Sequence, residues 1–147
     1  MKANILILGA VMLSLCACSQ QIKTEKIPSV VSNTLKAKFV NASETDWKKK
    51  GGIFEAEFTV GTVEWTAEID SAGQLLRTRR DIPVSELPLK VTQALDNLYK
   101  GKVIDEVERI EQGNLVFYQV ELDEKPKDLE LVFTSEGVVV QTPVYWD

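Results

Sequence analysis

Apolar residues recur at every fourth position in two short segments of the chain, and each segment predicts an amphipathic helix. The two apolar stripes consist of Val31, Leu35 and Phe39 and of Leu87, Val91, Leu95 and Tyr99. Such a spacing places side chains on one face of a helix. Pro28 and Pro88 precede the stripes, and a proline suits a helix start because the amide hydrogen it lacks would be unpaired there anyway. We expect both stripes to face the core.

Two hairpins follow from the alternation of apolar and polar residues. Gly61-Thr62 forms a two-residue turn with glycine first, which favours a type II′ hairpin. The resulting register pairs Phe54 with Ile69, Ala56 with Ala67, and Phe58 with Trp65. A second hairpin in the same register pairs Tyr118 with Phe133, Val120 with Leu131, and Leu122 with Leu129. Shifting the first hairpin by one residue would bring glutamates to the apolar face, so this register is strongly specified.

The order of helix and strands occurs twice along the chain, which predicts an internal repeat. Gly73 and Gly137 occupy equivalent turns in the two halves. We therefore expect an α+β fold, built as a tandem repeat over residues 27–86 and 87–147. Each repeat is expected to hold one helix and a four-stranded antiparallel sheet, with the helices packed on one sheet face.

Four segments resemble the PepSY-like family of bacterial secreted lipoproteins, which is described as beta-lactamase-inhibitor-like. They read IPSVVSNTLKAKF, GIFEAEFTVGTVEWTAEIDSAGQLL, LPLKVTQALDNLY and LVFYQVEL. The second half departs from the family pattern at Thr134, where an aspartate is expected. The resemblance implies a helix-plus-four-strand unit used twice, and it implies no established activity.

The N-terminal residues predict a lipoprotein signal. Lys2 precedes an apolar segment at residues 5–15, which is shorter than the roughly 20 residues that a membrane span needs. The residues before Cys18 resemble a lipobox, which implies cleavage after residue 17 and a diacylglycerol on Cys18. Residues 18–26 are then the lipidated cysteine and a flexible tether. Ser19, in place of aspartate, favours the outer membrane on its periplasmic side; a plain signal peptide with a free Cys18 is the alternative.

The composition of the chain mainly excludes classes of function. The chain has 17 Lys and Arg against 22 Asp and Glu, and this acidic balance disfavours nucleic-acid binding. It has no histidine, which excludes histidine-based acid–base catalysis and histidine-ligated zinc. No nucleophile has an evident base partner, and no glycine-rich phosphate loop is present. We expect no enzymatic activity, no catalytic residue and no cofactor.

Four glutamates on the outer face of the first hairpin leave two interpretations open. These residues are Glu55, Glu57, Glu64 and Glu68, with Glu55 directly opposite Glu68. A cluster of carboxylates suits Ca²⁺, which binds six to eight oxygen atoms. The other interpretation is a solvated charge ladder, with Lys48 opposite Glu55 and Arg79 or Arg80 opposite Glu64. Because no Asp-x-Asp-x-Asp-Gly loop is present, we predict no metal site and keep binding of a small ligand or cation as the alternative function.

Residues 115–120 are apolar on both faces of their predicted strand. On the outer face, Phe117 and Val132 predict a partner-binding patch together with Tyr145 and Trp146 from the C-terminal segment. The alternative is that the C-terminal segment or the other repeat folds over the patch and covers it. We expect a lipid-anchored envelope protein that binds, inhibits or modulates another envelope protein through its sheet face.

Overall fold

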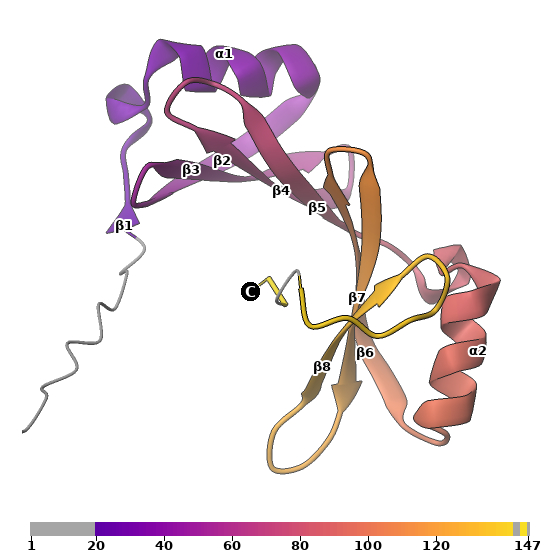
Figure 1. Ribbon diagram of the computed structural model, residues 1–147. Coiled ribbons are helices and arrows are strands. Elements are labelled where there is room, and N and C mark those ends of the chain that lie inside the picture. The colour runs from indigo at the N-terminus through magenta and orange to yellow at the C-terminus, as the bar shows by residue number, and fades with distance from the viewer. Residues whose placement is uncertain (1–19, 143–144, 147) are drawn as a thin grey trace, which may run out of the picture.

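The computed structural model describes residues 20–142, 145 and 146 (Figure 1). The strands are β1 (Gln20–Gln21), β2 (Ala42–Lys50), β3 (Ile53–Val60), β4 (Val63–Asp70), β5 (Leu75–Asp81), β6 (Val103–Gln112), β7 (Leu115–Asp123) and β8 (Leu129–Thr134). The helices are α1 (Ser29–Lys38) and α2 (Leu89–Leu98), each preceded by a short 3₁₀ turn, η1 (Thr24–Lys26) and η2 (Val84–Glu86). The predicted signal peptide and Cys18 lie outside the described residues. Within those residues, neither helix has the length and apolarity that a membrane crossing requires.

The strands form one antiparallel sheet in the order β1 to β8. The predicted tandem repeat of a helix and a four-stranded sheet is therefore wrong. Strand β5 pairs with β6, with Thr78 opposite Glu111 and Asp81 opposite Glu108, and this pairing merges the two halves into a single sheet. An unpaired β5 edge would leave its backbone groups without partners, and β6 satisfies them.

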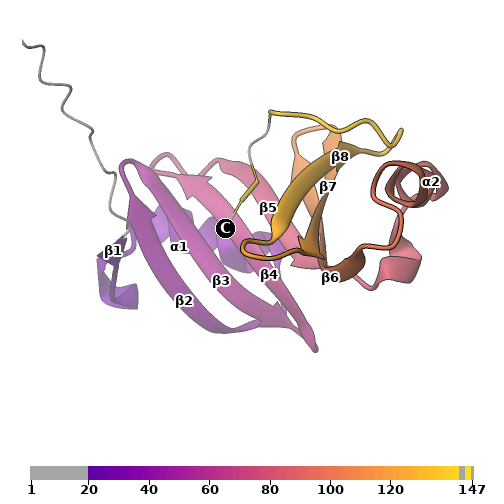
Figure 2. The same cartoon turned by 90° about the horizontal axis from the view of Figure 1, so that it is seen from below.

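The second half also contributes three strands where four were expected. After β8 the chain forms one isolated bridge, between Phe133 and Val139. It then runs toward the C-terminus across the other side of the sheet (Figure 2). The last predicted strand is reduced to this bridge, beside which Val140 donates to Val132 and Thr134 donates to Val138, and farther along the chain Tyr145 and Trp146 pack on the sheet face.

Both hairpin registers are confirmed, because Ala56 pairs with Ala67 and Val120 pairs with Leu131. One cross-strand prediction is wrong, namely the placement of an arginine opposite Glu64. A bulge between Glu68 and Ile69 shifts β5, so that Arg79 lies opposite Thr66 and Arg80 lies opposite Trp65.

Two apolar clusters hold the helices against the sheet. Helix α1 buries Val31 and Leu35 among residues of β2, β3 and β4, and α2 buries Val91 and Leu95 among residues of β6, β7 and β8. The turn after β8 passes close beneath α2 at Gly137, whose φ is 77°. A Cβ atom there would lie 2.3 Å from the carbonyl oxygen of Lys90, so this turn requires glycine.

No helix in the described part of the chain covers the opposite face of the sheet (Figure 1). The β2–β5 part and the β6–β8 part of the sheet meet at a steep angle, and the C-terminal segment lies within that angle (Figures 1 and 2). We call this surface the helix-free face. It contains the candidate site.

Candidate binding site on the helix-free face

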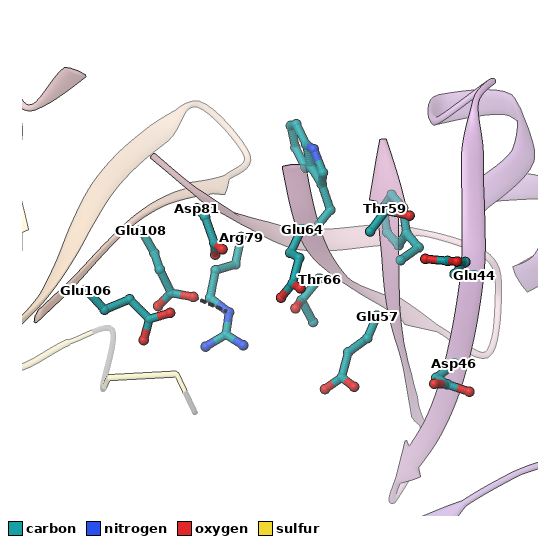
Figure 3. A pocket seen from close by; sticks show the side chains of 12 residues that line it. Glu44, Asp46, Glu57, Thr59, Glu64, Thr66, Arg79, Asp81, Glu106 and Glu108 are labelled. Carbon is teal, nitrogen blue, oxygen red and sulfur yellow. Dashed lines mark ion pairs between the residues drawn. The ribbon is translucent and has the colours of Figure 1, made fainter. Parts of the chain in front are cut away.

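An acidic pocket of about 480 Å³ occupies the helix-free face (Figure 3). Strands β2 to β6 all contribute to it. Its charged lining comprises Arg79 and seven carboxylates, Glu44, Asp46, Glu57, Glu64, Asp81, Glu106 and Glu108. In Figure 3 the Arg79 guanidinium lies between Glu106 and Glu108 on one side and Glu64 and Glu57 on the other. With one cation against seven acidic groups, the pocket favours positively charged ligands.

Glu108 is the buried carboxylate of this pocket. It is 4% exposed, and its Oε1 lies 3.1 Å from Nε of Arg79. Its Oε2 accepts a hydrogen bond of 2.7 Å from the Gln119 side-chain amide. Burial raises the pKa of Glu108 to about 7 and nearby Glu106 adds to the effect, while Arg79 and the Gln119 hydrogen bond oppose it. The charge of the pocket therefore changes near neutral pH.

Three carboxylates come close together at the β5–β6 end of the pocket. One oxygen each from Asp81, Glu106 and Glu108 can be chosen such that all three lie within 4.8 Å of one another. Burial, followed by the charge of Glu64, raises the pKa of Asp81. A cation would reduce the repulsion among these carboxylates, but the Arg79 guanidinium already lies beside Glu108 and offsets part of their negative charge.

The four glutamates considered for Ca²⁺ do not converge on one point. Glu68 accepts two hydrogen bonds from Arg77, at 2.6 and 2.7 Å, and Glu57 forms an ion pair with Lys48. Glu57 and Glu64 line the acidic pocket. Glu55 lies opposite Glu68, as predicted, and does not line that pocket.

A second group of residues surrounds the side chain of Trp146. The indole N–H donates to Glu55 at 3.1 Å, and the ring lies 3.9 Å from the Arg77 guanidinium carbon. The Trp146 backbone N–H donates to the Gln119 side-chain oxygen at 2.6 Å, and the Gln119 amide donates to the Trp146 carbonyl at 3.2 Å. Arg79 also donates to that carbonyl, which joins this group to the acidic pocket. We call Glu55, Arg77, Arg79 and Gln119 the indole site.

The structure brings together three of the four residues predicted to bind a partner, Phe117, Val132 and Tyr145, and it places Trp146 in the indole site. Phe117 and Val132 form a buried cluster with Ile110, and Val140 and Tyr145 pack against it. Trp146 is 5% exposed, and Tyr145 is partly buried. The C-terminal segment thus covers the patch, which was one of the two alternatives left open by the sequence. Whether these residues bind a partner remains a prediction.

Sequence reasoning did not identify Arg77, Glu108 or Gln119 as site residues. Gln119 carried a usable signal, since it is the only polar residue between Leu115 and Val120. A polar side chain in a strand that is apolar on both faces needs a buried partner. Nothing in the local pattern identifies that partner as Trp146, because the two residues are 27 positions apart.

By sequence, the chain is similar to one described family of proteins. Residues 52–141 match a family described as "Putative beta-lactamase-inhibitor-like, PepSY-like". No curated protein matches the chain.

Three crystal structures of proteins from Bacteroides species share the fold. A DUF2874 family protein from Bacteroides uniformis has a TM-score of 0.71 at 19% identity, covering 78% of this chain and 86% of its own. A BLIP-like protein from Bacteroides fragilis has a TM-score of 0.67 at 23% identity, covering 77% of this chain and 82% of its own. A protein from Bacteroides eggerthii, whose description reads "putative periplasmic", has a TM-score of 0.73 at 16% identity, covering 78% of this chain and 86% of its own. At these identities the likeness establishes the fold alone.

Proposed function

The chain belongs to the PepSY-like, beta-lactamase-inhibitor-like family, and we propose that it is a binding protein of the cell envelope that docks a protein partner on its helix-free face. The observation that carries this proposal is the acidic pocket of about 480 Å³ beside the indole site on a face that no described helix covers. Function resides in such a site and not in the fold, which many unrelated activities share.

The charge of the pocket specifies the kind of partner. Seven carboxylates face one arginine, so the complementary surface carries lysine or arginine. A standard interface buries about 1,200–2,000 Å², which is more than the pocket alone provides. The partner therefore extends along the helix-free face toward Tyr145 and Trp146. Phe117 and Val132 lie beneath the C-terminal segment and contribute once that segment moves.

The proposed location is the periplasmic side of the outer membrane. Cys18 would carry the lipid two residues before β1 (Gln20–Gln21), which pairs with β2, and so would hold the folded part close to the membrane; residues 20–26 are part of the folded structure and not the flexible tether that was predicted. The description of the B. eggerthii structure as periplasmic supports an envelope location. The partner is then another envelope protein, which the domain inhibits or modulates.

Photo-cross-linking in intact envelopes tests the proposal. A photoreactive residue replaces Thr59, which lines the acidic pocket, in the full-length protein. We expect one cross-linked partner, with a yield that falls when Glu57→Gln and Glu64→Gln remove pocket charge and also when salt is raised. The matched control is Asp96→Asn, which removes an exposed charge on α2. Equal yields from the pocket variant and the control would refute docking on this face.

Cation binding is the second candidate function, and the approach of Asp81, Glu106 and Glu108 favours it. A ligand present at 100 times its Kd stabilises the folded state by about 2.7 kcal/mol. Millimolar Ca²⁺ should then raise the melting temperature by several degrees, and Glu106→Gln should abolish the effect. A melting temperature that does not respond to Ca²⁺ eliminates this candidate.

A further inference from the structure

We propose that the indole site is a recognition site for an extended peptide segment bearing tryptophan, and that Trp146 is its resident ligand, supplied by the chain itself. This inference rests on the proposed function, because it names the chemistry of the partner segment. It follows from the contacts that converge on Trp146 from three strands, β3, β5 and β7.

The backbone of Trp146 is held by a buried amide. Gln119 is 0% exposed, and both ends of its side-chain amide are used, one accepting from the Trp146 N–H and the other donating to the Trp146 carbonyl. This paired contact reproduces what a neighbouring β-strand offers, so it selects an extended backbone. It makes no use of the tryptophan side chain and suits any residue at that position.

The side chain of Trp146 is selected by a different set of groups. Glu55 accepts the indole N–H at 3.1 Å, which phenylalanine cannot donate. The ring packs against two guanidinium groups, with carbon atoms 3.9 Å (Arg77) and 5.2 Å (Arg79) from its centroid. Tryptophan gives the strongest interaction of this cation–π type. Backbone and side chain together define a tryptophan in an extended segment.

The Trp146 site lies beside the face on which we place the partner. Arg79 belongs to both, since it pairs with Glu108 in the acidic pocket and donates to the Trp146 carbonyl. Residues 141 and 142, which lead toward the site, are exposed. A segment attached to the same chain has an effective concentration of about millimolar, so a partner segment must outcompete it. The resident tryptophan therefore sets a threshold for partner binding.

The test measures binding of a labelled seven-residue peptide with the sequence of residues 141–147, QTPVYWD, by fluorescence anisotropy. The receptor is the full chain carrying Trp146→Ala, which removes the resident indole. We expect this receptor to bind the peptide at least about tenfold more tightly than the wild-type chain does, because the wild-type site is occupied. The same peptide with alanine at the tryptophan position should not bind, and adding Gln119→Leu to the receptor should abolish binding.

A conservative variant keeps the test decisive if Trp146→Ala does not fold. Trp146→Phe retains an aromatic ring but lacks the N–H that Glu55 accepts, so its peptide affinity should lie between those of the wild type and a chain without a resident ligand. Equal peptide affinity of the wild type and Trp146→Phe, or binding that ignores the tryptophan of the peptide, overturns the inference.

The cross-link at Thr59 separates this inference from the proposed function. A folded receptor that ignores the peptide, together with a cross-link that depends on pocket charge, overturns the indole site alone. Peptide binding without any envelope cross-link supports the indole site and overturns docking in the acidic pocket.

Discussion

Glu108 should make the stability of the protein depend on pH in a direction opposite to that of an ordinary ion-paired carboxylate. Burial raises its pKa from 4.5 to about 7, despite Arg79 at 3.1 Å. Between these values the folded chain holds a proton that the unfolded chain releases. The contribution of Glu108 to the free energy of unfolding is therefore fully present below about pH 4.5, and it is lost as the pH rises through 7.

The size of the effect follows from the shift. A change from 4.5 to about 7, at 1.36 kcal/mol per pKa unit, gives about 3 kcal/mol across the whole range. The side chain is only 5% exposed, so solvent screening reduces this little. For a domain of this size the difference corresponds to roughly 10 °C in melting temperature.

Urea unfolding at pH 5, 6, 7 and 8 would measure this contribution in the wild type and in Glu108→Gln. Glutamine keeps an oxygen that can accept the Gln119 hydrogen bond, but it does not titrate. The stability advantage of the wild type over the variant should shrink by about 2–3 kcal/mol from pH 5 to pH 8. The control Asp96→Asn should keep a constant difference from the wild type. A Glu108→Gln difference that stays within about 0.5 kcal/mol over this range would refute the claim that burial controls this carboxyl.

Two further comparisons test the packing that positions the site. Gly137→Ala should destabilise the fold by about 2–4 kcal/mol in urea unfolding, because its Cβ would meet the Lys90 carbonyl. Gly61→Ala, with φ of 66° but open space around it, should cost only about 1 kcal/mol, and equal costs would contradict the close approach. Phe133→Ala should cost about 3–5 kcal/mol because Phe133 is fully buried. Leu115→Ala, at a 60% exposed position, should stay within about 0.5 kcal/mol by the same assay.

The local structure could be predicted from the sequence because each local signal is set by neighbouring residues. The helical stripes contain the buried residues Leu35 and Leu95, and the turn at Gly61-Thr62 fixes the β3–β4 register. A register error there would expose apolar residues and bury glutamates, so few alternatives compete.

The joining of the two halves could not be predicted in the same way. Strand β5 carries Arg77, Arg79 and Arg80 and resembles an exposed edge, since charged side chains commonly protect sheet edges. These arginines instead pair with acidic groups on neighbouring elements, including Glu68 on β4 and Glu108 on β6. The Arg79–Glu108 pair joins strands that are separated in the sequence by α2, and no periodicity marks it.

The position of the C-terminal segment follows from the strand that is apolar on both sides. Helix α2 covers one face of β7 through Val120, which leaves Phe117 and Gln119 on the other face to be covered. An apolar segment alone would cover Phe117, but it would leave the buried Gln119 amide partly unpaired, at a cost of about 1–3 kcal/mol. Trp146 meets this requirement with its backbone N–H and carbonyl. A partner that displaces the segment must supply the same two backbone groups as well as a ring. The face should therefore bind an extended segment with a tryptophan in preference to a surface that is only apolar.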